Sequence, residues 1–133
     1  MRMRTCGFAA GTVLWLSLVP VGKADAHHSA AMFDRAKSVT LHGTVREFQW
    51  SNPHCFIQLL ALTEGKVVEW SVEMGSPTEL YRGGWRPSTV RPGQQVTITI
   101  HPQRDGSPGG LFSTGSNADG IPLGAKATTA KVP

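Results

Sequence analysis

Histidine is the residue type in this chain best suited to site chemistry, and two of its five histidines are adjacent. His27 and His28 follow an Ala-Asp-Ala triplet at 24–26. A neutral imidazole is a good ligand for copper, zinc or nickel. If the mature chain begins at His27, its free α-amine and imidazole can chelate one metal ion, and His28 offers a second imidazole. The pair therefore points to a candidate transition-metal site. Copper is the first choice because an exported protein meets no reducing pool.

The first 26 residues read as a cleaved signal peptide. Arg2 and Arg4 precede an almost wholly apolar run over 6–19, and the Ala-Asp-Ala triplet supplies the small-x-small pattern that signal peptidase recognises. The apolar run falls short of the roughly 20 residues that a membrane-spanning helix needs. An uncleaved anchor is the alternative. We expect cleavage after Ala26 and a periplasmic or secreted protein with no membrane span.

The expected mature chain has room for one small domain with one core. Its 107 residues carry ten basic and eight acidic side chains, because Arg2, Arg4, Lys23 and Asp25 leave with the signal peptide. No basic stripe remains, so we expect no nucleic-acid partner. Cys55 is then the single cysteine, which excludes an intramolecular disulfide and favours a small buried hydrophobe over a reactive thiol.

The periodicity of the mature chain predicts five strands and a short helix. Residues 37–50 begin with strict alternation, and the apolar parity then changes, which predicts a bulge near Arg46 and Glu47, with Gly43 easing the bend. Strands are expected over 55–63 and 66–74 around a Glu64-Gly65 turn, then over 95–101 and, weakly, over 111–115. Between them, Ser76 and Glu79 form a capping box that begins a short helix.

This order is that of the OB-fold, an all-β, five-stranded barrel with a short helix between strands three and four. A β-sandwich needs about seven strands, more than the sequence offers. We therefore expect an N-terminal arm over 27–38, an OB-like barrel domain over 39–123, and a disordered tail over 124–133.

The OB topology suggests ligands that could complete the metal site. In this fold the loops between strands one and two and between strands four and five line one rim. The first loop holds His54, and the second follows His101. If the arm folds back over that rim, His27, His28, His54 and His101 could meet. The alternatives stay open: the adjacent pair could be only a polar start, and no HExxH or paired-cysteine motif is present.

The same rim offers a second reading without metal. Trp50, Asn52 and Arg104 would lie there, in an accessory binding module for a small molecule, a glycan or an envelope protein partner. Trp50 and Trp85 fall at element ends, where we expect them to seal the barrel rather than to form a stacking platform. No nucleophile elbow is present, so we do not expect an enzyme.

Several segments resemble a family of small exported bacterial proteins that carry a domain of unknown function. They are "AHHSAAMFD", "GTVREFQWSNPH", "VEWSVEMGSP" and "VTITIHPQRDGSPGG". The likeness extends from Ala26 to about Leu123. It implies export and a single β-rich domain, and it implies no activity or cofactor. Gly115, Ser116 and Asn117 stand where such proteins usually have a more apolar strand.

Overall fold

The computed structural model describes residues 31–124 of the chain. The predicted signal peptide, His27, His28 and nearly all of the predicted tail lie outside the described residues. The elements within them are five strands and one short helix: β1 (Val39–Gln49), β2 (Phe56–Thr63), β3 (Lys66–Glu73), α2 (Pro77–Arg82), β4 (Gln95–Pro102) and β5 (Gly109–Asn117). The predicted element order is confirmed.

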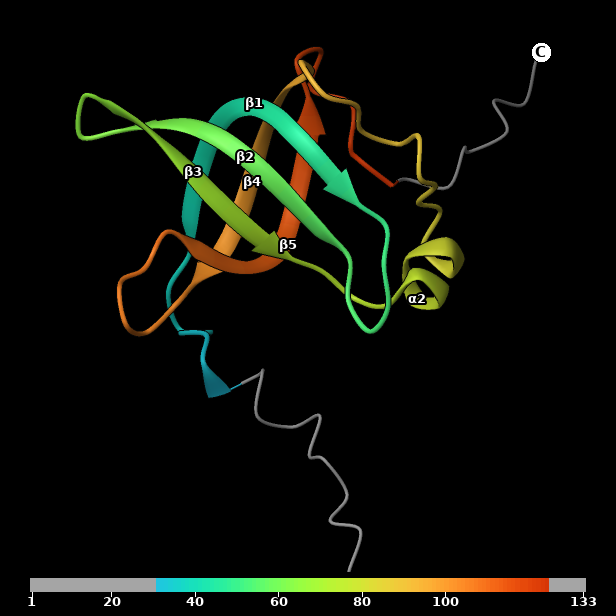
Figure 1. Ribbon diagram of the computed structural model, residues 1–133, viewed down its shortest axis with the longest axis horizontal. Helices are drawn as coiled ribbons and strands as arrows, with labels where there is room; N and C mark the ends of the chain where they lie inside the picture. Colours follow the sequence, from blue (N-terminus) through green and yellow to red (C-terminus); the bar gives the residue numbers. More distant parts are fainter. Residues whose placement is uncertain (1–30, 125–133) are drawn as a thin grey trace, which may run out of the picture.

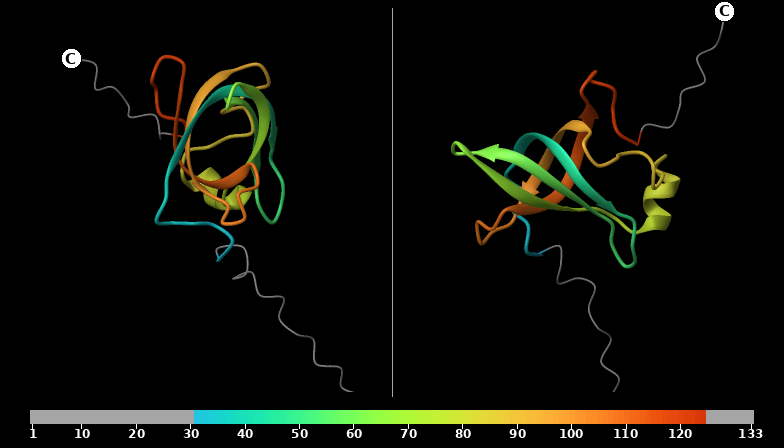
Figure 2. Two further views of the ribbon diagram at one scale, coloured as in Figure 1. Left: turned by 90° about the vertical axis from the view of Figure 1, so that its left-hand side faces the viewer. Right: turned by 45° about the horizontal axis from the view of Figure 1, so that its top comes forward.

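The five strands close into a barrel in the order β1-β2-β3-β5-β4, which Figure 2 shows end-on in its left view. All neighbouring strands are antiparallel except β3 and β5, which pair in parallel from Ser71 opposite Gly109 to Glu73 opposite Leu111. Helix α2 lies between β3 and β4 in the chain and sits beside the β1–β2 loop (Figure 1). The fold is therefore an OB-like barrel.

Strand β1 serves both sides of the barrel because it bends. Its first half pairs with β4 from Val39 to Thr44, and its second half pairs with β2 from Gly43 to Gln49. The register shifts between Val45 and Glu47, where the change of apolar parity predicts a bulge. At the bend, a Cβ on Gly43 would lie 2.4 Å from the carbonyl oxygen of Leu60, so only glycine lets the two backbones approach this closely.

Strand β5 is longer than the predicted fragment at 111–115 and closes the barrel. It pairs with β4 from Pro102 opposite Gly110 to Val96 opposite Asn117. The weak β-propensity of its glycines is outweighed by their position, because a Cβ at Gly110 would lie 2.5 Å from the carbonyl oxygen of His101. Close packing against β4 thus needs a residue that propensity alone disfavours.

The core follows the predicted alternation, and aromatic side chains seal one end of the barrel. Trp85 is buried and packs edge-on against Phe112, with ring centroids 5.4 Å apart, and also against Phe48. This confirms the sealing role expected for Trp85. The rest of the buried cluster comes mainly from the strands: Leu41, Val45, Cys55, Ile57, Leu59, Ala61, Val72, Met74, Val90, Val96, Ile98 and Ile100.

Helix α2 begins with the predicted capping box. The Ser76 hydroxyl accepts from the backbone N–H of Glu79, and the Glu79 carboxylate accepts from the backbone N–H of Ser76 at 2.8 Å. Among residues 31–124, no helix is long and apolar enough to cross a membrane.

Candidate functional site

The N-terminal arm is attached to the β4–β5 loop rather than extending away from the barrel. Phe33 is buried and forms an isolated antiparallel bridge with Gln103. The backbone N–H of Asp34 donates to the carbonyl of Pro102 at 2.8 Å, and that of Arg104 donates to the carbonyl of Met32 at 2.9 Å. These contacts bring the segment that follows His27 and His28 in the sequence to the loop after His101.

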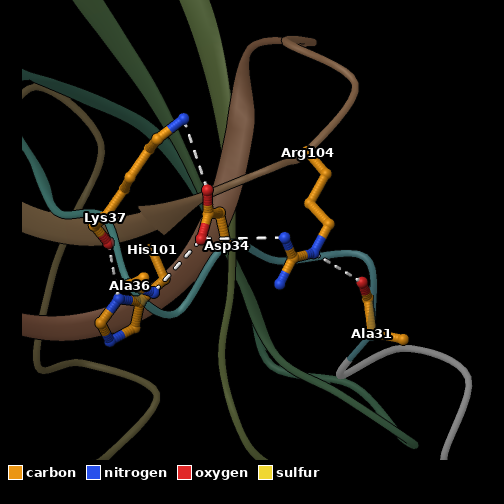
Figure 3. Close-up of polar contacts among 6 residues, drawn as sticks. All are labelled: Ala31, Asp34, Ala36, Lys37, His101 and Arg104. Atoms are coloured by element: carbon orange, nitrogen blue, oxygen red, sulfur yellow. Dashed lines mark hydrogen bonds and ion pairs between the residues drawn. The ribbon is translucent and has the colours of Figure 1, made fainter.

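Asp34 is the polar centre of this attachment (Figure 3). Its carboxylate lies 3.4 Å from the Lys37 ammonium and 3.8 Å from the Arg104 guanidinium, and it accepts from the N–H of Ala36. The Arg104 Nε donates to the carbonyl of Ala31 at 3.2 Å. Desolvation acts to raise the pKa of Asp34, but the hydrogen bonds and the two cations outweigh it and hold the pKa below its usual range.

His101 is oriented by the arm. Its Nδ1 lies 2.8 Å from the carbonyl oxygen of Lys37, which fixes the ring and leaves Nε2 outside this contact (Figure 3). A histidine that ligates a metal commonly donates its other ring N–H to a carbonyl or carboxylate. The arrangement around His101 is therefore suitable for a ligand, although it is also a satisfied structural contact.

His54 is held in a comparable way by a different partner. Its Nδ1 lies 2.6 Å from a carboxylate oxygen of Glu73, whose side chain is 17% exposed, while that of His54 is 34% exposed. The Ser51 hydroxyl donates to the backbone carbonyl of His54 at 3.0 Å and tightens the β1–β2 loop. This pair could orient an imidazole toward a ligand or simply neutralise a half-buried carboxylate.

The structure does not join His54 and His101 into one centre. Leu111 of β5 pairs with Glu73 on one side and with His101 on the other, so a whole strand separates His101 from the partner of His54. Within residues 31–124, no group of three or more His, Cys, Asp or Glu is placed to hold a metal ion. The OB topology suggested a common rim, but the sheet register sets the two imidazoles on either side of β5.

The alternative site residues are separated in the same way. Arg104 is engaged by Asp34 and Ala31 at the arm, whereas Trp50 lies at the opposite loop. Asn52 is exposed and precedes Pro53 through a cis peptide bond. Trp50 is partly buried against the core and also lines a pocket. It does not share a site with Arg104.

Sequence reasoning missed the other residues of that pocket. They are Pro77, Thr78, Tyr81 and Arg82, all on α2. Their spacing of one and four residues places them on one face of a helix, which is a signal that the sequence contains. Asp34 and Lys37 of the arm were also missed, because a local pattern does not indicate a partner some 70 residues away.

Fold and site together define a small OB-like binding domain with an arm fastened across its β4–β5 loop. The model of the "Family of unknown function (DUF6152)" matches residues 16–114. The chain therefore belongs to this family.

The other comparisons add little to this assignment. No curated protein matches the chain in sequence. Among solved structures, the chain is similar to the crystal structure of the mitochondrial single-stranded DNA-binding protein Rim1 from S. cerevisiae. The two share 12% identity with a TM-score of 0.45, over 62% of this chain and 94% of that chain. Neither the fold assignment nor any functional inference rests on this remote likeness.

Proposed function

We propose that the protein is an exported binding protein that holds a transition-metal ion, copper in the first place, through His27, His28 and His101. The observation that carries the proposal is the contact between His101 Nδ1 and the Lys37 carbonyl. It orients the ring and leaves Nε2 as the atom for a metal, the arrangement that metal-ligating histidines commonly have.

The attachment of the arm supports the same proposal. Arg104 binds the carbonyl of Ala31, and His28 precedes Ala31 by three residues. Three residues span at most about 10 Å, so the amino-terminal pair stays within a short reach of the β4–β5 loop. His54 is left out of this ligand set because Glu73 engages it on the other side of β5.

The test is a Cu(II) titration of the processed protein, after mass spectrometry has identified its first residue. Placing one residue before His27 should weaken Cu(II) binding by orders of magnitude, because the chelate ring needs the free amine. His101→Ala should weaken it by about tenfold, the loss of roughly 1.4 kcal/mol of ligand binding.

His42→Ala and His54→Ala are matched controls that remove an imidazole elsewhere and should leave the affinity unchanged. Equal affinity for the extended and the native amino terminus contradicts the proposal. A chain that begins at another residue, or one that binds no Cu(II), contradicts it too.

A second candidate function is the binding of a small molecule in the pocket that Trp50 lines. It is favoured because this pocket is independent of the arm and combines aromatic walls with an arginine.

A further inference from the structure

An open pocket of about 320 Å³ lies between the end of β1 and one face of α2. Its lining residues are Trp50, Pro77, Thr78, Tyr81 and Arg82. A closed cavity of roughly 150 Å³ is enough to hold benzene, so this volume accommodates one or two fused rings. In Figure 1 the pocket elements lie on the other side of the barrel from the arm.

The aromatic walls of the pocket are held in place by different means. Trp50 packs edge-on against Phe48 with ring centroids 5.6 Å apart, and Phe48 packs against the buried Trp85. The indole is therefore anchored to the aromatic cluster that seals the barrel. Tyr81 is 58% exposed, and the guanidinium carbon of Arg86 lies 3.8 Å from its ring centroid. An exposed tyrosine opposite an anchored indole provides two flat surfaces for a ring.

The charge of the pocket is positive. Within the described residues, no ion pair involves Arg82 or Arg86. Arg86 is fixed, because its Nη1 donates to the carbonyls of Tyr81 and Trp85. The nearby acid, Glu79, is occupied by the backbone N–H and hydroxyl of Ser76. Arg82 thus lines the pocket with its guanidinium available for a carboxylate, which it can bind through two parallel hydrogen bonds.

We propose that this pocket binds a small aromatic carboxylate, with its ring between Trp50 and Tyr81 and its carboxylate at Arg82. The proposal rests on the second candidate function and needs neither the arm nor a metal. Its failure would therefore leave the metal proposal untouched, and failure of the metal proposal would leave this one untouched.

The experiment is an NMR titration of the ¹⁵N-labelled processed protein with 2-naphthoate, and with 2-naphthamide as the neutral compound of the same shape. We expect 2-naphthoate to shift the indole N–H signal of Trp50 saturably. The indole N–H of Trp70 donates to Thr63 Oγ1, away from the pocket, and its signal should stay in place. The amide should bind about five- to tenfold more weakly, because it lacks the charge-assisted contact to Arg82.

Two variants test the two halves of the site. Arg82→Gln should weaken 2-naphthoate binding about five- to tenfold and leave 2-naphthamide binding unchanged, whereas Tyr81→Ala should weaken both. Arg91→Gln, which removes an exposed arginine outside the pocket, is the matched control and should change neither. Thermal melting verifies that each variant is folded, which the exposure of Tyr81 and Arg82 leads us to expect. Equal affinity for acid and amide, an unaffected Arg82→Gln, or the absence of a saturable Trp50 shift overturns the proposal.

Discussion

The Nδ1 atom of His54 lies 2.6 Å from a carboxylate oxygen of Glu73, across the seam between the β1–β2 loop and the end of β3. This contact assigns His54 to the α2 side of the barrel, whereas the Lys37 carbonyl assigns His101 to the arm. Two imidazoles that looked equivalent in the sequence therefore have different neighbours.

The His54–Glu73 contact predicts the tautomer of His54. A carboxylate accepts hydrogen bonds, so neutral His54 should carry its proton on Nδ1. Imidazole ¹⁵N shifts measured at a pH where the ring is neutral will show this directly. Glu73→Gln should weaken the preference, and the His42 signals should not change in that variant. An Nε2–H tautomer of His54 in the native protein would contradict the assignment.

The bend of β1 predicts an intolerance at Gly43. Gly43→Ala places a Cβ 2.4 Å from the carbonyl oxygen of Leu60, so a backbone must move. We expect the free energy of unfolding to fall by about 1–3 kcal/mol, the usual cost of overpacking a tight site, as measured by urea denaturation. Thr44→Ala, one residue along the same strand, should cost less than about 1 kcal/mol. If Gly43→Ala is no more destabilising than Thr44→Ala, the close approach at the bend is wrong.

Asp34 predicts that the arm detaches in acid. Its folded pKa is lowered, so its contribution is present above the unfolded pKa of about 3.9 and is lost as the pH falls through the folded value. Protection of the Asp34 and Arg104 amides from hydrogen exchange should therefore fall below about pH 4. Asp34→Asn should reproduce this loss at neutral pH, by severalfold. Asp119→Asn, an exposed aspartate outside the arm, should leave protection unchanged. Full protection in Asp34→Asn would show that Asp34 does not fasten the arm.

The capping box predicts a measurable loss on changing Ser76. Ser76→Ala should lower the free energy of unfolding by about 1 kcal/mol, whereas Ser76→Asp, which keeps an N-cap acceptor, should cost only a few tenths. The hydrogen bonds from Ser76 lower the pKa of Glu79, so stability from this carboxylate is lost as the pH falls through its folded pKa. The effect of Ser76→Ala measured by urea denaturation should therefore shrink in acid. A pH-independent effect would contradict the role of Glu79.

Burial predicts that Cys55 is unreactive in the folded protein. Its side chain is fully buried, and this burial raises the pKa of the thiol. Because the thiolate is the reactive form, labelling by a disulfide reagent at pH 8 should be at least about a hundredfold slower than in urea, since it requires opening of the barrel. Rapid labelling of the native protein would show that the β1–β2 loop opens readily.

Local patterns were sufficient for most of the fold. Alternating parity predicts β1 to β4, the parity change predicts the bulge before Glu47, and Ser76 with Glu79 predicts the start of α2. These features are decided by neighbours a few residues apart, so the sequence displays them. Strand β5 was underestimated because its glycines have low β-propensity, while their value lies in close approach to β4 and β3, which depends on residues far along the chain.

The amino-acid sequence by itself determined which residues face inward, where the helix begins and which side chains are capable of chemistry. Only the tertiary structure decided which of them meet. Asp34 reaches Arg104 across 70 residues, Trp50 joins α2 rather than Arg104, and β5 separates Glu73 from His101. Periodicity reports the direction of a side chain relative to its own backbone, whereas a site depends on the register between strands, which barrel closure sets.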